Sequence, residues 1–381
     1  MQNQWIALFL HDRVNNYQLL LREDAETTAL RYDHRVVIYS ADKIAENQVK
    51  QIRSVISESK SHPPSAILVS PVRESSLIGA MVDAANQRIP WIYLCRWSDT
   101  VHTVRRDRPG YSAFSVAADQ AQIGRLQGQM LRCLISDEQE LVYIQGPQGT
   151  SSVSRRQMAS QRELKILQKL RWAPYNSDWS TEGGAHAMRS WLANFKCGKL
   201  PQYAVCAQND DMAWGARIAL VEGGHVSRGD SPIIIGCDGL STFGQRLVAE
   251  GMLTATVIVP PVSGRALDEL FRAQSMRVTA PAEVSVEVVP YPGLENLEKG
   301  AEVYEKRHAI SGRAPDPSTA ASDLFAATLK EVAASSRQAT AARALSTAAH
   351  DGPPQGKQTS EPTGATSAGA SRSGATDGRS R

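Results

Sequence analysis

Short apolar runs alternate with longer amphipathic stretches along most of the chain, and this alternation limits the folds open to it. Residues 5–10, 35–39 and 66–72 are apolar runs rich in strand-forming residues, and a stretch with helical period follows each of them. Runs that are apolar on both faces and separated by helices are typical of parallel sheets covered on both sides. The pattern therefore predicts an α/β fold.

The alternation occurs in two series, which predicts two doubly wound parallel-sheet lobes. The expected strands are 5–10, 35–39, 66–72, 91–95, 113–118, 141–145, 172–179, 204–206, 233–236 and 255–259. The expected helices are 15–31, 44–60, 75–88, 120–135, 151–170, 184–196, 210–222, 242–251 and 262–273. The first series closes at the run that begins with Trp91.

The carboxyl-terminal part differs from this body. Residues 351–381 contain no Ile, Leu, Val or aromatic residue, so they cannot bury enough apolar surface to offset their ordering entropy. We expect a disordered tail there. Residues 310–350 are alanine-rich and compatible with a loose helix but not with a domain. The folded body is expected to span about residues 3–310.

Charge and hydropathy exclude several classes of protein. The chain holds 42 Lys and Arg against 39 Asp and Glu, a balance without the basic surplus of a nucleic-acid or anionic-membrane binder. No apolar run approaches the roughly 18–20 residues of a membrane helix. The apolar run 5–10 is too short for a secretory leader and lacks a cleavage site, so the chain is expected to carry no export signal.

No motif for catalysis or metal binding is present. The five cysteines include no Cys-x-x-Cys pair, and the eight histidines show no metal-ligand spacing. There is no phosphate-binding loop of the Walker type and no nucleophile elbow. We therefore expect no metal, no cofactor and no enzymatic activity.

Polar residues gather where the expected strands end. In open α/β sheets the ligand lies beyond the carboxyl ends of the strands. The segments that follow these ends include 11–17, 95–97, 146–151, 207–211 and 237–239, which are rich in Asn, Asp, Arg and Gly. Together they predict a ligand-binding cleft between the lobes.

One of these segments resembles a known signature. Residues 207–216 read AQNDDMAWGA, which resembles the motif of ribose-type sugar-binding proteins, the type I periplasmic binding proteins that serve ABC importers. The likeness continues through IIGCDG at 234–239 and VAEGMLTATV at 248–257. It covers about residues 5–295, and the amino-terminal half matches in pattern more than in letters.

The resemblance implies a non-enzymatic receptor whose two lobes close over a sugar or sugar-like ligand. The chain would cross between the lobes three times, near 111–116, 258–262 and 288–293. Lobe one would comprise 1–115 and 261–289, and lobe two 116–260 and 290–309.

The same resemblance implies a cellular location and a protein partner. A monomeric protein of the periplasm or cell envelope would deliver its ligand to a membrane permease. The alternative is a ligand-sensing module of a regulatory or chemosensory system with the same fold. A cytoplasmic location is the alternative that follows from the absent leader.

Carried over position by position, the family's ligand contacts fall on Asn16, Arg96, Arg156, Asn209 and Asp238. An Asp carboxylate accepts from neighbouring hydroxyls, and an Arg guanidinium donates to ring or hydroxyl oxygens. Trp97, beside Arg96, is the candidate ring for stacking against a sugar.

Each of these residues also has a structural alternative. Asn16 and Asn209 could cap helices, although Asp210 or Asp211 is the more expected cap of the helix that follows Asn209. Arg96 and Arg156 could be surface residues, and Asp238 a turn residue. Further candidates are expected to be structural: Trp214 as a core residue, and Cys95 and Cys237 as small buried residues.

The sequence departs from the family pattern in the expected cleft. Cys95 stands where the family usually has an aspartate, Val259 where it often has a glutamine, and Gln18 and Leu19 where it has an aromatic pair. Two arginines then face a single aspartate, Asp238. This balance indicates a ligand other than ribose, one with an acidic or otherwise electron-rich group.

Overall fold

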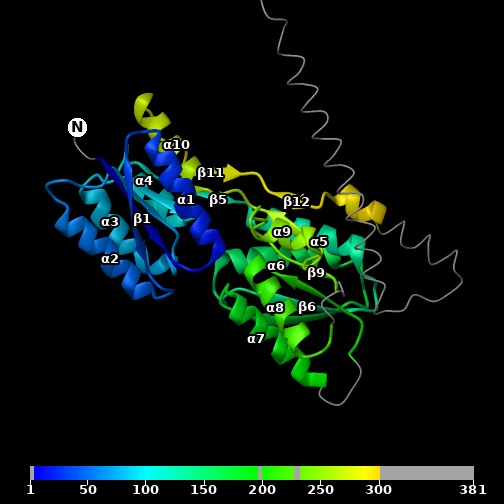
Figure 1. Cartoon of the computed structure of the whole chain (residues 1–381). Coiled ribbons are helices and arrows are strands. Elements are labelled where there is room, and N and C mark those ends of the chain that lie inside the picture. The colour runs from blue at the N-terminus through cyan, green and yellow to red at the C-terminus, as the bar shows by residue number, and fades with distance from the viewer. Residues whose placement is uncertain (1–3, 196–199, 227–231, 301–381) are drawn as a thin grey trace, which may run out of the picture. The chain divides into compact units, whose positions relative to one another are not determined.

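The computed structural model describes residues 4–195, 200–226 and 232–300 (Figure 1). The alanine-rich segment 310–350 and the tail 351–381, for which a loose helix and disorder are expected, lie outside the described residues.

The larger sheet has six parallel strands in the order β11-β5-β4-β3-β1-β2. Its strands are β1 (Trp5–Leu10), β2 (Arg35–Ser40), β3 (Ala66–Val69), β4 (Trp91–Leu94), β5 (Ala113–Ala118) and β11 (Glu283–Val286). This sheet confirms the predicted parallel α/β architecture.

A second, four-stranded parallel sheet has the order β7-β6-β8-β9. Its strands are β6 (Glu140–Gln145), β7 (Arg171–Asn176), β8 (Tyr203–Ala207) and β9 (Ile234–Ile235). A short antiparallel pair, β10 (Thr256–Ile258) with β12 (Val289–Tyr291), joins it through single bridges beside β9.

Helices connect the strands of both sheets. They are α1 (Asn16–Leu30), α2 (Ala45–Glu58), α3 (Ile78–Asn86), α4 (Asp99–Asp107), α5 (Gln120–Leu134), α6 (Ser151–Leu164), α7 (Thr181–Leu192), α8 (Asp210–Glu222), α9 (Gly244–Ala249) and α10 (Ser263–Ser275). Two 3-10 turns, Glu74–Leu77 and Ala193–Phe195, complete the elements. Residues 294–300 are also helical.

Both faces of the larger sheet are covered, as its apolar strands require. Leu8 of β1 packs in one cluster with Leu21 of α1 and Leu267 of α10. Its neighbour Phe9 points the other way, into a cluster with Ile52 of α2. Because successive side chains of a strand alternate between the faces, one apolar strand supports two layers of helices.

Most predicted elements are found within a few residues of their expected limits, but α4, β11, β12 and the helical segment 294–300 were not predicted. Helix α4 has only Val101 and Val104 on its buried face, which is too weak a helical period to detect. Strand β11 is a four-residue edge strand with alternating burial, and β12 has three residues. Helix α6 ends at Leu164, before the expected limit at residue 170.

The chain passes between the two sheets three times. It leaves β5 after Ala118 to enter α5, returns between β10 and α10, and leaves again between β11 and β12. Helix α10 packs on α1, whereas α5 packs on α6, so each helix stays with its own sheet.

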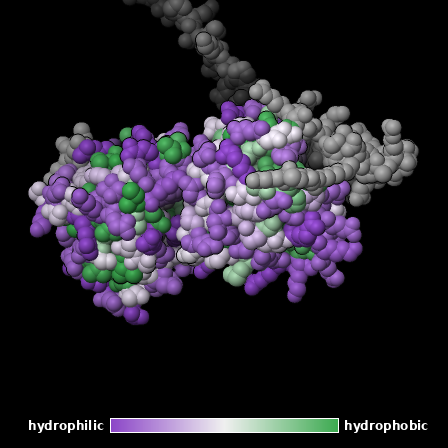
Figure 2. Space-filling view, turned by 90° about the horizontal axis from the view of Figure 1, so that it is seen from below, coloured by the Kyte–Doolittle hydropathy of each residue, from purple (hydrophilic) through white to green (hydrophobic). Residues whose placement is uncertain are grey.

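One face of the molecule is mainly polar. The face shown in Figure 2 is hydrophilic over most of its area, with smaller hydrophobic patches. No helix among the described residues has the length and apolar character needed to cross a bilayer.

Helices α7 and α8 pack so closely that two glycines are required between them. A Cβ added at Gly215 would lie 1.9 Å from the carbonyl oxygen of Thr181, and one at Gly184 would lie 2.3 Å from that of Met212. Both obstacles are backbone atoms, which cannot rotate away as a side chain can. The contact therefore depends on the missing side chains.

We predict that Gly215→Ala destabilises the protein by about 1–3 kcal/mol, the usual cost of overpacking. Gly293→Ala is the control, because nothing lies within 4 Å of a Cβ at that position. Thermal unfolding followed by circular dichroism should show a lower Tm for the first variant only. Equal Tm values for both variants would contradict this account of the α7–α8 contact.

Candidate ligand-binding site

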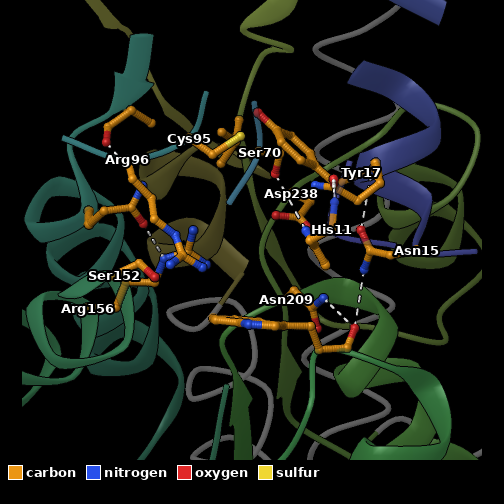
Figure 3. A pocket seen from close by; sticks show the side chains of 15 residues that line it. His11, Asn15, Tyr17, Ser70, Cys95, Arg96, Ser152, Arg156, Asn209 and Asp238 are labelled. Atoms are coloured by element: carbon orange, nitrogen blue, oxygen red, sulfur yellow. Dashed lines mark hydrogen bonds between the residues drawn. The ribbon is translucent and has the colours of Figure 1, made fainter. Parts of the chain in front are cut away.

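A pocket of about 90 Å³ lies where strand ends of the two sheets meet (Figure 3). The larger sheet contributes residues that follow β1, β3, β4 and β5, and the smaller one contributes residues that follow β6, β7, β8 and β9. The lining residues are His11, Asn15, Tyr17, Gln18, Ser70, Cys95, Arg96, Ala118, Gln120, Ser152, Arg156, Trp179, Asn209, Asp238 and Val259. The pocket is thus built by both sheets at the edge where ligands bind in such folds.

Four of the six predicted site residues come together in this pocket: Arg96, Arg156, Asn209 and Asp238. The other two, Asn16 and Trp97, are not among its lining residues. Asn16 instead donates from Nδ2 to Oδ1 of Asp211, at 2.7 Å. Contact with a ligand stays a prediction for all six.

Asparagines begin two of the helices beside the pocket. Oδ1 of Asn15 accepts from the backbone N–H of Gln18 at the start of α1, at 3.2 Å. Oδ1 of Asn209 accepts from that of Met212 at the start of α8, at 2.9 Å. The expectation that Asp210 or Asp211 caps α8 was wrong. The side chain one position earlier does so, because the strand end places Asn209 at the non-helical cap position.

Both cap asparagines also bind the same carbonyl group. Nδ2 of Asn15 and Nδ2 of Asn209 donate to the backbone oxygen of Trp179, at 3.2 and 3.0 Å. This oxygen therefore joins the end of β1, from the larger sheet, to the end of β8. Each side-chain amide thus caps a helix with its oxygen and binds the backbone of the pocket residue Trp179 with its nitrogen.

Arg156 is buried, and protein groups hold its guanidinium in place. Nε donates to Oε1 of Gln120 at 2.7 Å, and Nη1 donates to the backbone oxygen of Gln208. The guanidinium carbon lies 5.8 Å from the centre of the Trp179 ring, within the range of a cation–π contact. Arg156 is therefore not the exposed helix residue of the structural alternative.

Arg96 has no such support. Its side chain is partly buried in the pocket, and it makes no hydrogen bond or ion pair with the residues that the structure describes. Burial lowers the pKa of its guanidinium, while the positive charge of Arg156 acts in the same direction. The donors of Arg96 are free to bind a ligand.

Asp238 carries the only carboxyl group of the pocket lining. Burial raises its pKa well above the usual range, and the nearby charge of Asp210 raises it further, against the opposing effect of Arg156. Its backbone has a φ of 107°, and the pocket residues Cys95 and Trp179 also have positive φ values, of 67° and 70°. Such strained backbone gathers at functional sites.

His11 is a further candidate contact that the resemblance did not select. Burial lowers its pKa to about 4, so the imidazole is neutral near pH 7. Its Nδ1 lies 3.5 Å from Oγ of Ser70, and its buried Nε2 has no hydrogen-bond partner among the described residues. The available signal was its position directly after β1.

Trp179 is a further lining residue that the resemblance did not select. It follows β7, and its ring packs so closely on Gly146 that a Cβ there would lie 2.1 Å from a ring carbon. The sequence pattern could not place this ring in the pocket, because its position depends on a contact between two separate loops.

Direct contacts also join the two sheets beside the pocket. Nζ of Lys43 donates to Oδ2 of Asp178 at 2.7 Å, and the Tyr17 hydroxyl donates to the backbone oxygen of Pro260 at 2.8 Å. With the bond from Asn16 to Asp211, these contacts hold the strand-end loops of the two sheets together. Burial raises the pKa of Asp211 to about 6.

A sequence profile of the periplasmic binding protein domain matches residues 6–274. The chain belongs to this family. Its members are binding proteins. No cluster of metal-ligating side chains that could hold an ion is found in the described part of the chain.

Two relatives of this chain are named for a polyol and a sugar that they bind. The xylitol-binding protein of Mycolicibacterium smegmatis is 28% identical over 226 residues, which are 58% of this chain and 57% of that protein. The ribose import binding protein RbsB of Salmonella typhimurium is 25% identical over 262 residues, 68% of this chain and 81% of that protein.

Solved structures show the same fold at lower identity. A periplasmic solute-binding protein of an ABC transporter from Actinobacillus succinogenes, with bound D-allose, has a TM-score of 0.65 at 21% identity. The match covers 76% of this chain and 97% of that one. The fructose-binding periplasmic domain of a hybrid two-component system has a TM-score of 0.63 at 20% identity, with 82% and 100% covered.

The loops of the smaller sheet are tied together by the buried carboxylate of Asp210. It accepts from the N–H of Gly239 and from Oγ1 of Thr256, both at 2.7 Å. A Cβ at Gly236 or Gly244 would lie 2.0 or 1.9 Å from one of its oxygens. Burial raises the pKa of Asp210 to about 7.

This raised pKa predicts a pH-dependent stability. A carboxyl group whose pKa is higher in the folded than in the unfolded state binds more protons when folded, so its contribution increases as the pH falls through 7. Between pH 8 and pH 6 the unfolding free energy of the wild type should rise by about 1 kcal/mol more than that of Asp210→Asn. Urea denaturation at both pH values measures this difference.

The variant keeps the shape of the side chain and can still accept from Gly239, so folding should be retained. Parallel pH profiles for the wild type and Asp210→Asn would show that the carboxyl of Asp210 is not the group that titrates.

Proposed function

We propose that the protein captures a small polyhydroxylated solute in this pocket and delivers it to an ABC-type importer. The observation that carries the proposal is the pocket itself, in which two arginines, an aspartate and an asparagine converge from both sheets. Two relatives are named for xylitol and ribose, which supports a sugar or a polyol as the class of ligand.

The two sheets with their helices would form the lobes. We place lobe one at about 1–115 and 261–289, and lobe two at about 116–260 and 290–309, with the hinge in the three connecting segments. The passage of the chain between the sheets in three places supports this division. The protein would act as a monomer in the periplasm or cell envelope.

The size of the pocket favours a single small molecule. A cavity that holds one water offers at least about 10–15 Å³ to a water-sized sphere. The 90 Å³ of this pocket is several times larger, which suits a monosaccharide or a short polyol and not an oligosaccharide.

The lining supplies polar groups for the hydroxyls of such a ligand and an apolar ring for its carbon skeleton. Asp238 and the free Nε2 of His11 can bind hydroxyls, and the donors of Arg96 can bind ring or hydroxyl oxygens. The Trp179 ring offers an apolar surface. Because these groups come from both sheets, all of them reach the ligand only when the lobes are closed, and binding therefore shifts the population toward closure.

Asp238→Asn is predicted to weaken binding about twofold to tenfold, because the amide replaces one of the two carboxyl oxygens and a hydrogen bond to a ligand hydroxyl contributes about 0.5–1.5 kcal/mol. Asparagine tolerates a positive φ, so the backbone at this position is preserved. Isothermal titration calorimetry with pentoses, hexoses, polyols and their acids measures the change.

Asp83→Asn is the matched control, because Asp83 pairs with Arg53 on the surface, away from the pocket lining. It should bind as the wild type does. If no compound of the panel binds at millimolar concentration, the proposed function is wrong.

A ligand-sensing role is the second candidate, and it is favoured by the shared fold with the fructose-binding domain of a two-component system. The two roles differ in what is lost when the gene is deleted. An importer component predicts loss of uptake of the labelled ligand. A sensor predicts intact uptake and loss of the transcriptional response to the ligand.

A further inference from the structure

The positive charges of the pocket lack matching negative charges. Arg96 and Arg156 both line it, whereas Asp238 is its only carboxyl group. In Figure 3, the two arginines lie on one side of the pocket, and His11, Asn15 and Tyr17 lie on the other. The pocket therefore has a cationic side and a neutral polar side.

Arg96 finds no counter-ion in its surroundings. The adjacent Cys95 could supply a negative charge only as a thiolate, and burial raises the pKa of this thiol to about 12. The charge of Glu74 reaches Arg96, but no ion pair forms between them. No ion pair forms between Asp238 and Arg96 among the described residues, and burial, which raises the pKa of Asp238, disfavours the charged form of its carboxyl.

Arg156 is bound by neutral acceptors only. Its partners are the amide oxygen of Gln120, the backbone oxygen of Gln208 and, at 3.6 Å, Sγ of Cys237. Burial raises the pKa of the Cys237 thiol as well, so this sulfur is uncharged. These contacts hold the guanidinium in place without neutralising it.

Two guanidinium groups, Arg156 buried and Arg96 partly buried, lack a paired carboxylate, which is energetically unfavourable, and an anion between them would relieve this cost. Their planar N–H forks match the geometry of a carboxylate, which can accept from both. We propose that the ligand is a sugar acid, a polyhydroxylated monocarboxylate whose carboxylate lies between Arg96 and Arg156.

The rest of the pocket supports this orientation. The hydroxyls of the ligand would face Asp238, Asn209 and the free Nε2 of His11. A pocket of 90 Å³ suits one small molecule. This inference rests on the proposed function and narrows it from polyhydroxylated solutes to acidic ones.

The test compares matched pairs that differ only in the acid group: galacturonate with galactose, glucuronate with glucose, and xylonate with xylitol. Isothermal titration calorimetry of the full chain at pH 7.5 is expected to show at least one acid that binds tenfold or more tightly than its neutral partner. Glucose 6-phosphate serves as a phosphate-bearing comparison.

Two variants locate the effect. Arg96→Gln should reduce the acid-to-neutral preference at least about tenfold. Cys95→Asp places a carboxylate beside Arg96, and the positive φ of 67° at this position suits aspartate. This variant should weaken the acid and spare or strengthen the neutral partner, a reversal that general damage to the fold would not produce.

Arg189→Gln is the control, because Arg189 is an exposed residue of α7 that pairs with Glu182 and Glu222 outside the pocket. It should keep the preference of the wild type. Neutral sugars that bind as tightly as their acids would overturn the inference and leave the proposed function standing. If glucose 6-phosphate binds tightly and none of the sugar acids does, the inference of a carboxylate ligand is wrong. If no compound of the panel binds, both proposals are wrong.

Discussion

The buried carboxylate of Asp210 is the contact on which the loops of the smaller sheet depend. It binds the N–H of Gly239 and the Thr256 hydroxyl, and it occupies space that a side chain at Gly236 or Gly244 would need. These bonds connect the start of α8 to the loop after β9 and to β10. The backbone that carries Asp238 into the pocket is thereby held in a conformation that non-glycine residues rarely adopt.

The charges of the pocket follow from the same burial. Carboxyl and thiol groups placed there gain a raised pKa, because burial penalises the charged form, whereas an arginine stays charged over the whole physiological range. Replacing a carboxylate by the thiol of Cys95 therefore changes the balance of the site more than it changes its shape. Under the proposal of an acidic ligand, this one residue would change the class of ligand while the framework stays the same.

The sequence predicted the framework well because a parallel sheet imposes a strong pattern. Apolar runs such as β1 and β5 have no other stable environment, and their ends define the site. The prediction of individual residue roles failed in two situations. In one, neighbouring residues are equally suited to the same role; in the other, the position of a side chain depends on contacts between distant parts of the chain. Asn209 and Asp210 are both good caps, and only the strand end decides between them. The place of Trp179 depends on a contact with Gly146, whereas His11 was missed although it directly follows β1.

A crystal structure of the protein with a bound sugar acid tests the central claim most directly. The account predicts one ligand between the two sheets, its carboxylate oxygens about 2.7–2.9 Å from guanidinium nitrogens of Arg96 and Arg156, and its hydroxyls on Asp238 and His11. A ligand bound outside this pocket, or one whose carboxylate points away from both arginines, would contradict it.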